Sequence, residues 1–140
     1  MAMTVQITFD CVDPHKQARF WAMALGYQKE DHTNFIAGLL AEGALQPSDV
    51  IEVDGGRGFV EVSACRDPAG LGPRLYFQRV EESKVVKNRV HLDLHVGHER
   101  VKAEAARLIE HGATMAWTSD DRGAYTITLR DPEGNEFCVD

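Results

Sequence analysis

Residues 88–96 alternate between apolar and polar side chains along almost their whole length. The apolar members are Val90, Leu92, Leu94 and Val96, and the polar members between them are His91, Asp93 and His95. Because alternate residues of a strand point to opposite faces, the pattern predicts a strand over residues 90–96 with two imidazoles and a carboxylate on one face. A solvent-exposed face is the simplest interpretation, but these groups also bind metals and transfer protons.

The same patterning predicts two similar halves, each with a strand, a helix and three further strands. In the first half, strands are expected at residues 5–10, 50–53, 59–65 and 75–80; in the second, at 90–96, 114–118, 124–129 and 136–139. Helices are expected at residues 13–25 and 98–111, where apolar residues recur at three- and four-residue intervals. Asp13 and Pro14 are typical of a helix start, and Gly26 of a helix end. Residues 34–45 are expected to form either a short helix or a capping loop.

A repeated Arg-Asp-Pro-x-Gly motif also relates the two halves. It occurs at residues 66–70 and 130–134, each time as a turn before the last strand of its half. An internal repeat of this kind indicates a duplicated α+β module. We expect a single domain over residues 1–140, with module one at 1–81, a linker at 82–87 and module two at 88–140.

Composition limits the classes of partner. The net charge is −7, from 15 basic and 22 acidic residues, and the basic residues form no cluster along the sequence. This balance argues against binding to nucleic acid or to an anionic membrane surface. The three cysteines show no Cys-x-x-Cys spacing, and no apolar run approaches the length of a membrane span. We expect a cytoplasmic protein.

Four stretches resemble motifs of a known superfamily. They are FDCVDPHKQARFW (9–21), LYFQRV (75–80), NRVHLDLHV (88–96) and RDPEGNEFCV (130–139). Together with the duplicated plan, they resemble the vicinal oxygen chelate superfamily of glyoxalases, bleomycin-resistance proteins and extradiol dioxygenases, and most closely its glyoxalase-like domain branch. The resemblance implies two tandem βαβββ modules forming a cup-shaped mixed sheet with helices packed outside. It also implies a small-molecule ligand in the cup and a homodimer.

The resemblance further implies where a metal would bind. Metal-dependent members place four ligands on the cup floor, from the first and last strands of each module. The matching positions here hold Gln6, Gln78, His91 and Cys138. Amide oxygens are weak ligands for zinc or nickel, and the carboxylates needed for glyoxalase I or extradiol chemistry are missing. No cofactor is therefore expected, and a divalent metal at these four positions is the alternative.

The predicted function is binding of a small polar or planar molecule, with lyase, dehydratase or isomerase chemistry if the protein is an enzyme. His91 would be the general base and Asp93 the residue that orients it. The expected ligand-binding residues are Gln6, Gln78, Cys138, His95, Trp117 and Tyr125. Structural roles remain open for all of them: a hydrogen-bonded histidine, an inert strand cysteine, a salt-bridged rim or core aromatics. Two other functions also remain open, a metal-dependent isomerase or dioxygenase and a non-catalytic drug-binding protein of the bleomycin-resistance type.

Overall fold

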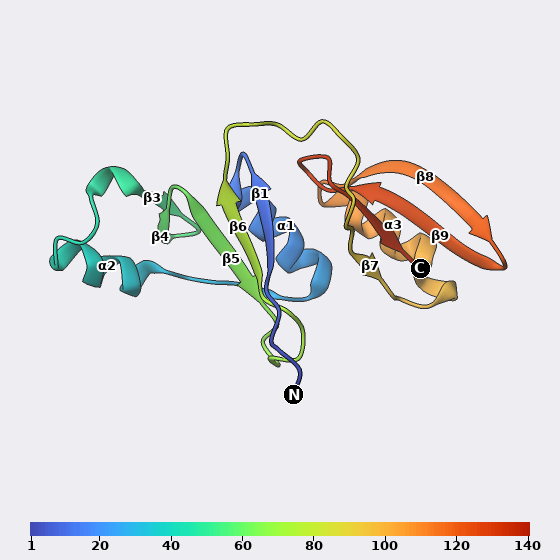
Figure 1. Cartoon of the computed structure of the whole chain (residues 1–140), viewed down its shortest axis with the longest axis horizontal. Coiled ribbons are helices and arrows are strands. Elements are labelled where there is room, and N and C mark those ends of the chain that lie inside the picture. The colour runs from blue at the N-terminus through green and yellow to red at the C-terminus, as the bar shows by residue number, and fades with distance from the viewer. The chain divides into compact units, whose positions relative to one another are not determined.

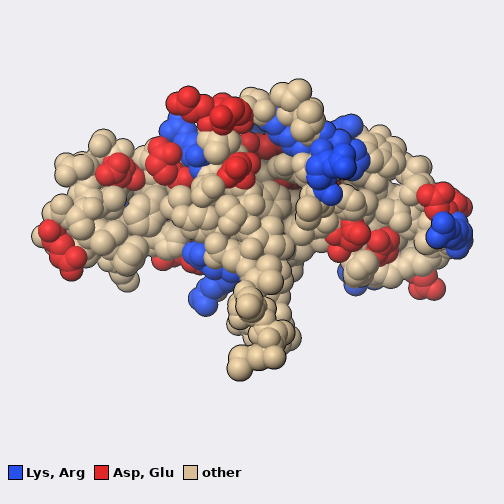
Figure 2. Space-filling model, viewed as in Figure 1, with Lys and Arg blue, Asp and Glu red and all other residues tan.

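The computed structural model describes all 140 residues as two compact units, Met1–Glu82 and Ser83–Asp140 (Figure 1). Each unit contains an open four-stranded mixed sheet with one helix packed on one face. The predicted α+β class and the internal repeat are thus confirmed. No helix is both long and apolar enough to cross a membrane. Figure 2 shows basic and acidic side chains interspersed over the face in view.

The sheet of the first unit has the strand order β1-β6-β5-β2, with β1 parallel to β6. Its helix α1 packs on β5 and β6. The elements of this unit are β1 (Ile7–Cys11), α1 (Pro14–Leu25), β2 (Gln28–Lys29), α2 (Thr33–Ala41), a 3-10 turn (Pro47–Asp49), β3 (Val50–Val53), β4 (Gly56–Phe59), β5 (Val62–Arg66) and β6 (Leu75–Arg79).

Helix α1 begins and ends as its sequence predicts. The Asp13 carboxylate accepts a hydrogen bond from the Lys16 backbone N–H at 3.0 Å, and Gly26 takes the left-handed conformation with φ +68°. Between these caps the helix buries Ala18 and Trp21. The indole of Trp21 lies 5.4 Å from the ring of Phe9 on β1, so the aromatic core joins the helix to the sheet.

The strand prediction for the first unit was partly wrong. The segment Val50–Val53 is a strand, but it pairs only with β4 in a separate hairpin. Its expected place in the main sheet is taken by β2, which at two residues is too short to show any periodicity. The strand expected over residues 59–65 is interrupted between Phe59 and Val62.

The second unit repeats the arrangement with the order β7-β10-β9-β8, and β7 is parallel to β10. Its helix α3 contacts β9 and β10 and buries Val101, Ala105 and Leu108. The elements of this unit are β7 (Asp93–Leu94), a 3-10 turn (His98–Arg100), α3 (Val101–Glu110), β8 (Thr114–Asp121), β9 (Ala124–Arg130) and β10 (Glu136–Val139).

Strand β7 is shorter than the alternation predicts. Only Asp93 and Leu94 satisfy the ladder pattern of a strand, and β7 lies at the edge of the sheet beside β10. Backbone bonds continue on either side, however, since the carbonyls of Leu92 and Leu94 accept from the N–H groups of Cys138 and Asp140 at 3.0 Å. The segment is therefore held against β10 in extended form.

The two Arg-Asp-Pro-x-Gly turns are stabilised in the same way, by an aspartate side chain that accepts hydrogen bonds from backbone N–H groups. Asp67 accepts backbone hydrogen bonds from Ala69, Leu71 and Gly72. Asp131, which is buried, accepts the backbone N–H of Glu133 and that of Asn135. In each unit the aspartate thus closes the turn that leads toward the last strand.

Candidate functional site

The face of the second sheet opposite α3, called the open face below, carries a row of four side chains, of which that of Thr128 is buried. Asp93 on β7 is in register with Cys138 on β10, Cys138 with Thr128 on β9, and Thr128 with Trp117 on β8. Residues in register point to the same face, so the four side chains form one row across the sheet. The alternate residues, such as Leu129 and Phe137, are buried on the face that α3 covers.

His91 and Asp93 form a hydrogen-bonded pair on this face. The His91 Nδ1 lies 2.8 Å from the Asp93 carboxylate, and the two side chains are 38% and 42% exposed. Because a carboxylate only accepts, Nδ1 must carry the proton, which leaves the Nε2 lone pair of a neutral ring free. The geometry therefore presents a proton acceptor whose tautomer is fixed by Asp93.

Cys138 lies between this pair and the rest of the row. Its Sγ is 3.5 Å from the Thr128 hydroxyl, and the side chain is half-buried. Burial raises the pKa of the Cys138 thiol, and the negative charges of Asp93 and Asp140 raise it further. The thiol is therefore neutral at physiological pH and a weak nucleophile.

A β-bulge brings Trp117 onto the open face. The register shifts between Met115 and Trp117, so Ala116 is an extra residue and Trp117 pairs with Thr128 rather than with Ile127. Trp117 is 41% exposed, and the cationic groups of Lys87 and Arg130 each lie 6.0 Å from its ring centre.

Tyr125, the other aromatic residue expected to bind the ligand, lies on the opposite face of the sheet from Trp117. Tyr125 is two residues before Ile127 on β9, so both side chains point to the same face, where Ile127 is buried. The Lys102 ammonium of α3 lies 5.7 Å from the centre of the Tyr125 ring. His95 does share the open face, where it forms an ion pair with Asp140. That pair raises the pKa of His95.

Gln6 and Gln78 belong to the first unit, where each is held by a neighbouring side chain. The Gln6 Oε1 accepts from the Arg74 guanidinium at 2.9 Å. The Gln78 Nε2 donates to the Asp10 carboxylate, its register partner on β1, at 2.7 Å. Both glutamines are exposed, so their amides can still contact a ligand.

Comparison with known proteins gives one family match that spans nearly the whole chain. A family model described as "Glyoxalase-like domain" matches residues 6–139. The chain belongs to this family. No curated protein matches it significantly.

Solved structures similar to this glyoxalase-like domain have the same superfamily fold at low sequence identity. A fosfomycin resistance protein, FosX, from Listeria monocytogenes, complexed with Mn(II) and 1S,2S-dihydroxypropylphosphonic acid, is 13% identical, with a TM-score of 0.63 over 99% of this chain and 89% of that one. A bleomycin-binding protein from Streptomyces verticillus, complexed with copper(II)-bleomycin, is 16% identical, with a TM-score of 0.56 over 99% and 95%. A glyoxalase/bleomycin resistance protein/dioxygenase family enzyme from Burkholderia phytofirmans is 17% identical, with a TM-score of 0.61 over 96% and 94%.

The glyoxalase-like domain also contains a candidate metal-binding cluster. One ligand atom each from His91, Asp93 and Cys138 lies within 4.8 Å of the others. Nitrogen, oxygen and sulfur are each donor types that zinc accepts, whereas Mn²⁺ prefers oxygen. The set thus fits a zinc-type ion, provided that the ion displaces the thiol proton. The four metal positions implied by the resemblance include His91 and Cys138, but their other members are Gln6 and Gln78, whereas the third member of this cluster is Asp93.

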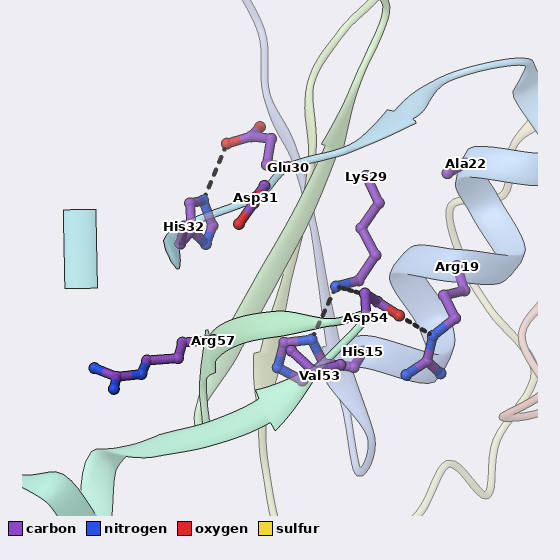
Figure 3. Close-up of a pocket in the computed structure, with 11 residues that line it drawn as sticks. His15, Arg19, Ala22, Lys29, Glu30, Asp31, His32, Val53, Asp54 and Arg57 are labelled. Carbon is purple, nitrogen blue, oxygen red and sulfur yellow. Dashed lines mark hydrogen bonds and ion pairs between the residues drawn. The ribbon is translucent and has the colours of Figure 1, made fainter. Parts of the chain in front are cut away.

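The first unit contains a cleft of about 320 Å³, which the sequence did not reveal (Figure 3). Its walls come from α1, β2 with the residues after it, and the β3–β4 hairpin. The side chains that line it are His15, Arg19, Ala22, Lys29, Glu30, Asp31, His32, Val53, Asp54 and Arg57, together with Gly58. These residues lie far apart in the sequence, and no spacing pattern connects them.

His15 and Lys29 organise the inner end of this cleft. The His15 Nε2 is 2.7 Å from the Phe59 carbonyl oxygen, so this nitrogen carries the proton and Nδ1 accepts from the Lys29 ammonium at 3.1 Å. Burial lowers the pKa of His15, and the positive charge of Lys29 lowers it further. The ring is therefore held neutral beside a charged ammonium.

Proposed function

We propose that this glyoxalase-like domain binds a small organic molecule on the open face of its second sheet, and that His91 moves a proton on that molecule. The supporting observation is the 2.8 Å hydrogen bond between His91 Nδ1 and Asp93. A histidine oriented by a carboxylate, with its second nitrogen free to accept, is a common arrangement for a general base.

In this proposal, Asp93 keeps the lone pair on Nε2 and stabilises the imidazolium after proton uptake. Nε2 removes a proton from the bound molecule and returns it at another atom or to a leaving group. This step suits a lyase, a dehydratase or an isomerase. Cys138 and Thr128 stay neutral and form the floor beneath the reacting atoms. Separately from this site, the family resemblance supports the amides of Gln6 and Gln78, on the first unit, as proposed ligand contacts.

The charges around Trp117 favour a planar ligand with an anionic group. The indole offers an exposed apolar surface, and Lys87 and Arg130 provide two cations beside it. Glu136, the register neighbour of Arg130, already binds Lys84 and the Asn88 backbone, so the guanidinium remains available to a ligand. If the carboxylate of a planar ligand binds between Lys87 and Arg130, the ring of that ligand would lie over Thr128 and Cys138 and extend toward His91.

The test compares His91→Ala and Asp93→Asn with the matched control His98→Ala, since His98 is exposed in the 3-10 turn before α3. A library of small planar acids is first screened for binding by ligand-observed NMR, and bound compounds are then assayed for turnover. Removing the base should lower turnover by about 10²–10⁴-fold, while His98→Ala should match the unaltered protein. Unchanged binding and turnover in His91→Ala would refute the proposal. If the unaltered protein and all variants bind a compound but none of them turns it over, a drug-binding role would be supported instead.

A metal-dependent reaction is the second candidate, and the His91–Asp93–Cys138 cluster favours it. A zinc-type ion held there would polarise an oxygen of the bound molecule as a Lewis acid. Elemental analysis after zinc supplementation and desalting tests this candidate. Stoichiometric zinc that Cys138→Ser abolishes would support it, and no retained metal would remove it.

Two further expectations accompany the proposal. The three cysteines are free rather than paired, which fits the expected cytoplasmic location. The family resemblance supports homodimerisation, which size-exclusion chromatography with light scattering measures directly. A mass of about 15.6 kDa rather than twice that value would contradict it.

A further inference from the structure

The cleft of the first unit has features of a second ligand site, independent of the proposed function. Its volume of about 320 Å³ is at the lower end of the range for small-molecule pockets. It lies between α1, which contributes His15, and the hairpin that carries Asp54 (Figure 3). Nothing in the chemistry proposed for His91 uses any of its residues.

One end of the cleft presents an ammonium group with spare hydrogen-bonding capacity. Lys29 donates to the Asp54 carboxylate at 2.6 Å and to the His15 Nδ1 at 3.1 Å. An ammonium has three N–H groups, so one donor remains, and the Lys29 side chain is only 16% exposed. Figure 3 shows the ammonium fixed between His15 and Asp54. The spare N–H is therefore already oriented, and a bound anion would not have to immobilise a flexible lysine.

Another wall presents a carboxylate with a spare acceptor. Oδ1 of Asp31 accepts both the backbone N–H and the hydroxyl of Thr33, at 2.9 Å and 2.6 Å. Its second oxygen, Oδ2, has no hydrogen-bond donor within the protein. The hydrogen bonds from Thr33 lower the pKa of Asp31, so this oxygen carries negative charge at neutral pH. It is available to a cationic group of a ligand.

The overall charge of the lining distinguishes between classes of ligand. The lining contains three cationic side chains, Arg19, Lys29 and Arg57, and three carboxylates, Glu30, Asp31 and Asp54. A simple anion or a simple cation would meet groups of its own sign at close range. A small molecule with one charge of each sign satisfies the spare donor and the spare acceptor together.

We propose that this cleft binds a small zwitterion of the α-amino acid class, with its carboxylate on the Lys29 ammonium and its amine on the Asp31 carboxylate. A side chain of modest size would lie toward the ring of His32, which also lines the cleft.

The experiment titrates the 140-residue chain with glycine and L-alanine, and separately with acetate and methylammonium. Backbone amide chemical shifts in ¹H–¹⁵N spectra report binding. Saturable shifts are expected at residues 29–32 and 53–58, and not at residues 91–95. Acetate and methylammonium should bind at least about tenfold more weakly, because each satisfies only one of the two groups.

Two variants and two matched controls test the assignment. Asp31→Asn and Lys29→Met should each weaken amino acid binding by about tenfold or more, whereas the exposed Asp121→Asn and Lys16→Met should not. Lys29→Met removes a partner of Asp54 and can disturb the hairpin, so the surface variant Asp31→Asn, checked for an otherwise unchanged amide spectrum, is decisive. No saturable shift at these residues, equal binding of acetate and glycine, or undiminished binding in Asp31→Asn would each overturn the proposal.

Discussion

Replacing Glu136 with glutamine should loosen the segment that leads to His91. Glu136 is buried, with 7% of the residue exposed, and its carboxylate accepts from the Lys84 ammonium at 2.9 Å and from the Asn88 backbone N–H at 3.0 Å. These bonds attach residues 84–88 to β10, immediately before the extended segment that carries His91 and Asp93. A glutamine removes the charge and replaces one acceptor oxygen by an N–H₂ donor.

The expected loss of stability follows from the pKa of this carboxyl. Burial alone would raise the pKa of Glu136, but the Asn88 N–H and the Lys84 ammonium outweigh it and lower the pKa from 4.5 to about 2. Each pKa unit corresponds to about 1.4 kcal/mol, so the ionised form stabilises the folded unit by roughly 3 kcal/mol. Because a neutral glutamine resembles the protonated acid, Glu136→Gln should cost about 2 to 3 kcal/mol at neutral pH.

Urea denaturation at several pH values measures this effect. Each unit has one tryptophan, Trp21 or Trp117, so a Trp21→Phe background reports on the second unit by fluorescence. The folded pKa is depressed, so the stabilisation is present above about pH 4.5 and is lost as the pH falls toward about 2. The difference in stability between the unaltered protein and the Glu136→Gln variant should therefore shrink by about 1.4 kcal/mol per pH unit below about pH 4.5. A difference that stays constant down to about pH 3.5, or no difference at about pH 7, would refute the reasoning.

Three further predictions concern the cleft and the row of side chains. Gly58→Ala should destabilise the first unit by about 1–3 kcal/mol, because a Cβ there would lie 2.6 Å from His15 Cε1; thermal unfolding measures this, and an unchanged midpoint would contradict it. In an NMR titration, His15 should have a pKa below 6.5 and His95 one above it. The His15 contribution to stability should accordingly be present above pH 6.5 and decline as the pH falls below that value, whereas a His15 pKa at or above 6.5 would mean that the ring is not buried as described. Cys138 should react with iodoacetamide more slowly than an unperturbed thiol at neutral pH, because its pKa is raised, and rapid alkylation would show that a thiolate is present.

The sequence was sufficient to determine the class and the repeat because both depend on local rules. Alternation and helical spacing are properties of neighbouring residues, and the Asp13 and Gly26 caps act within a single turn. The two aspartate-closed turns are equally local. The same rules predicted that His91 and Asp93 share a face, and the 2.8 Å hydrogen bond between them follows from that spacing.

Only the tertiary structure decided which side chains meet across the sheet. Local alternation cannot reveal the bulge at Ala116, yet that one extra residue moves Trp117 onto the open face and separates it from Tyr125. Strand β2 is defined only by its pairing with β5, because its two residues carry no pattern of their own. The cleft depends on contacts such as Lys29 with His15 and Asp54, which join three separate segments, and its position therefore depends on packing rather than on any local rule.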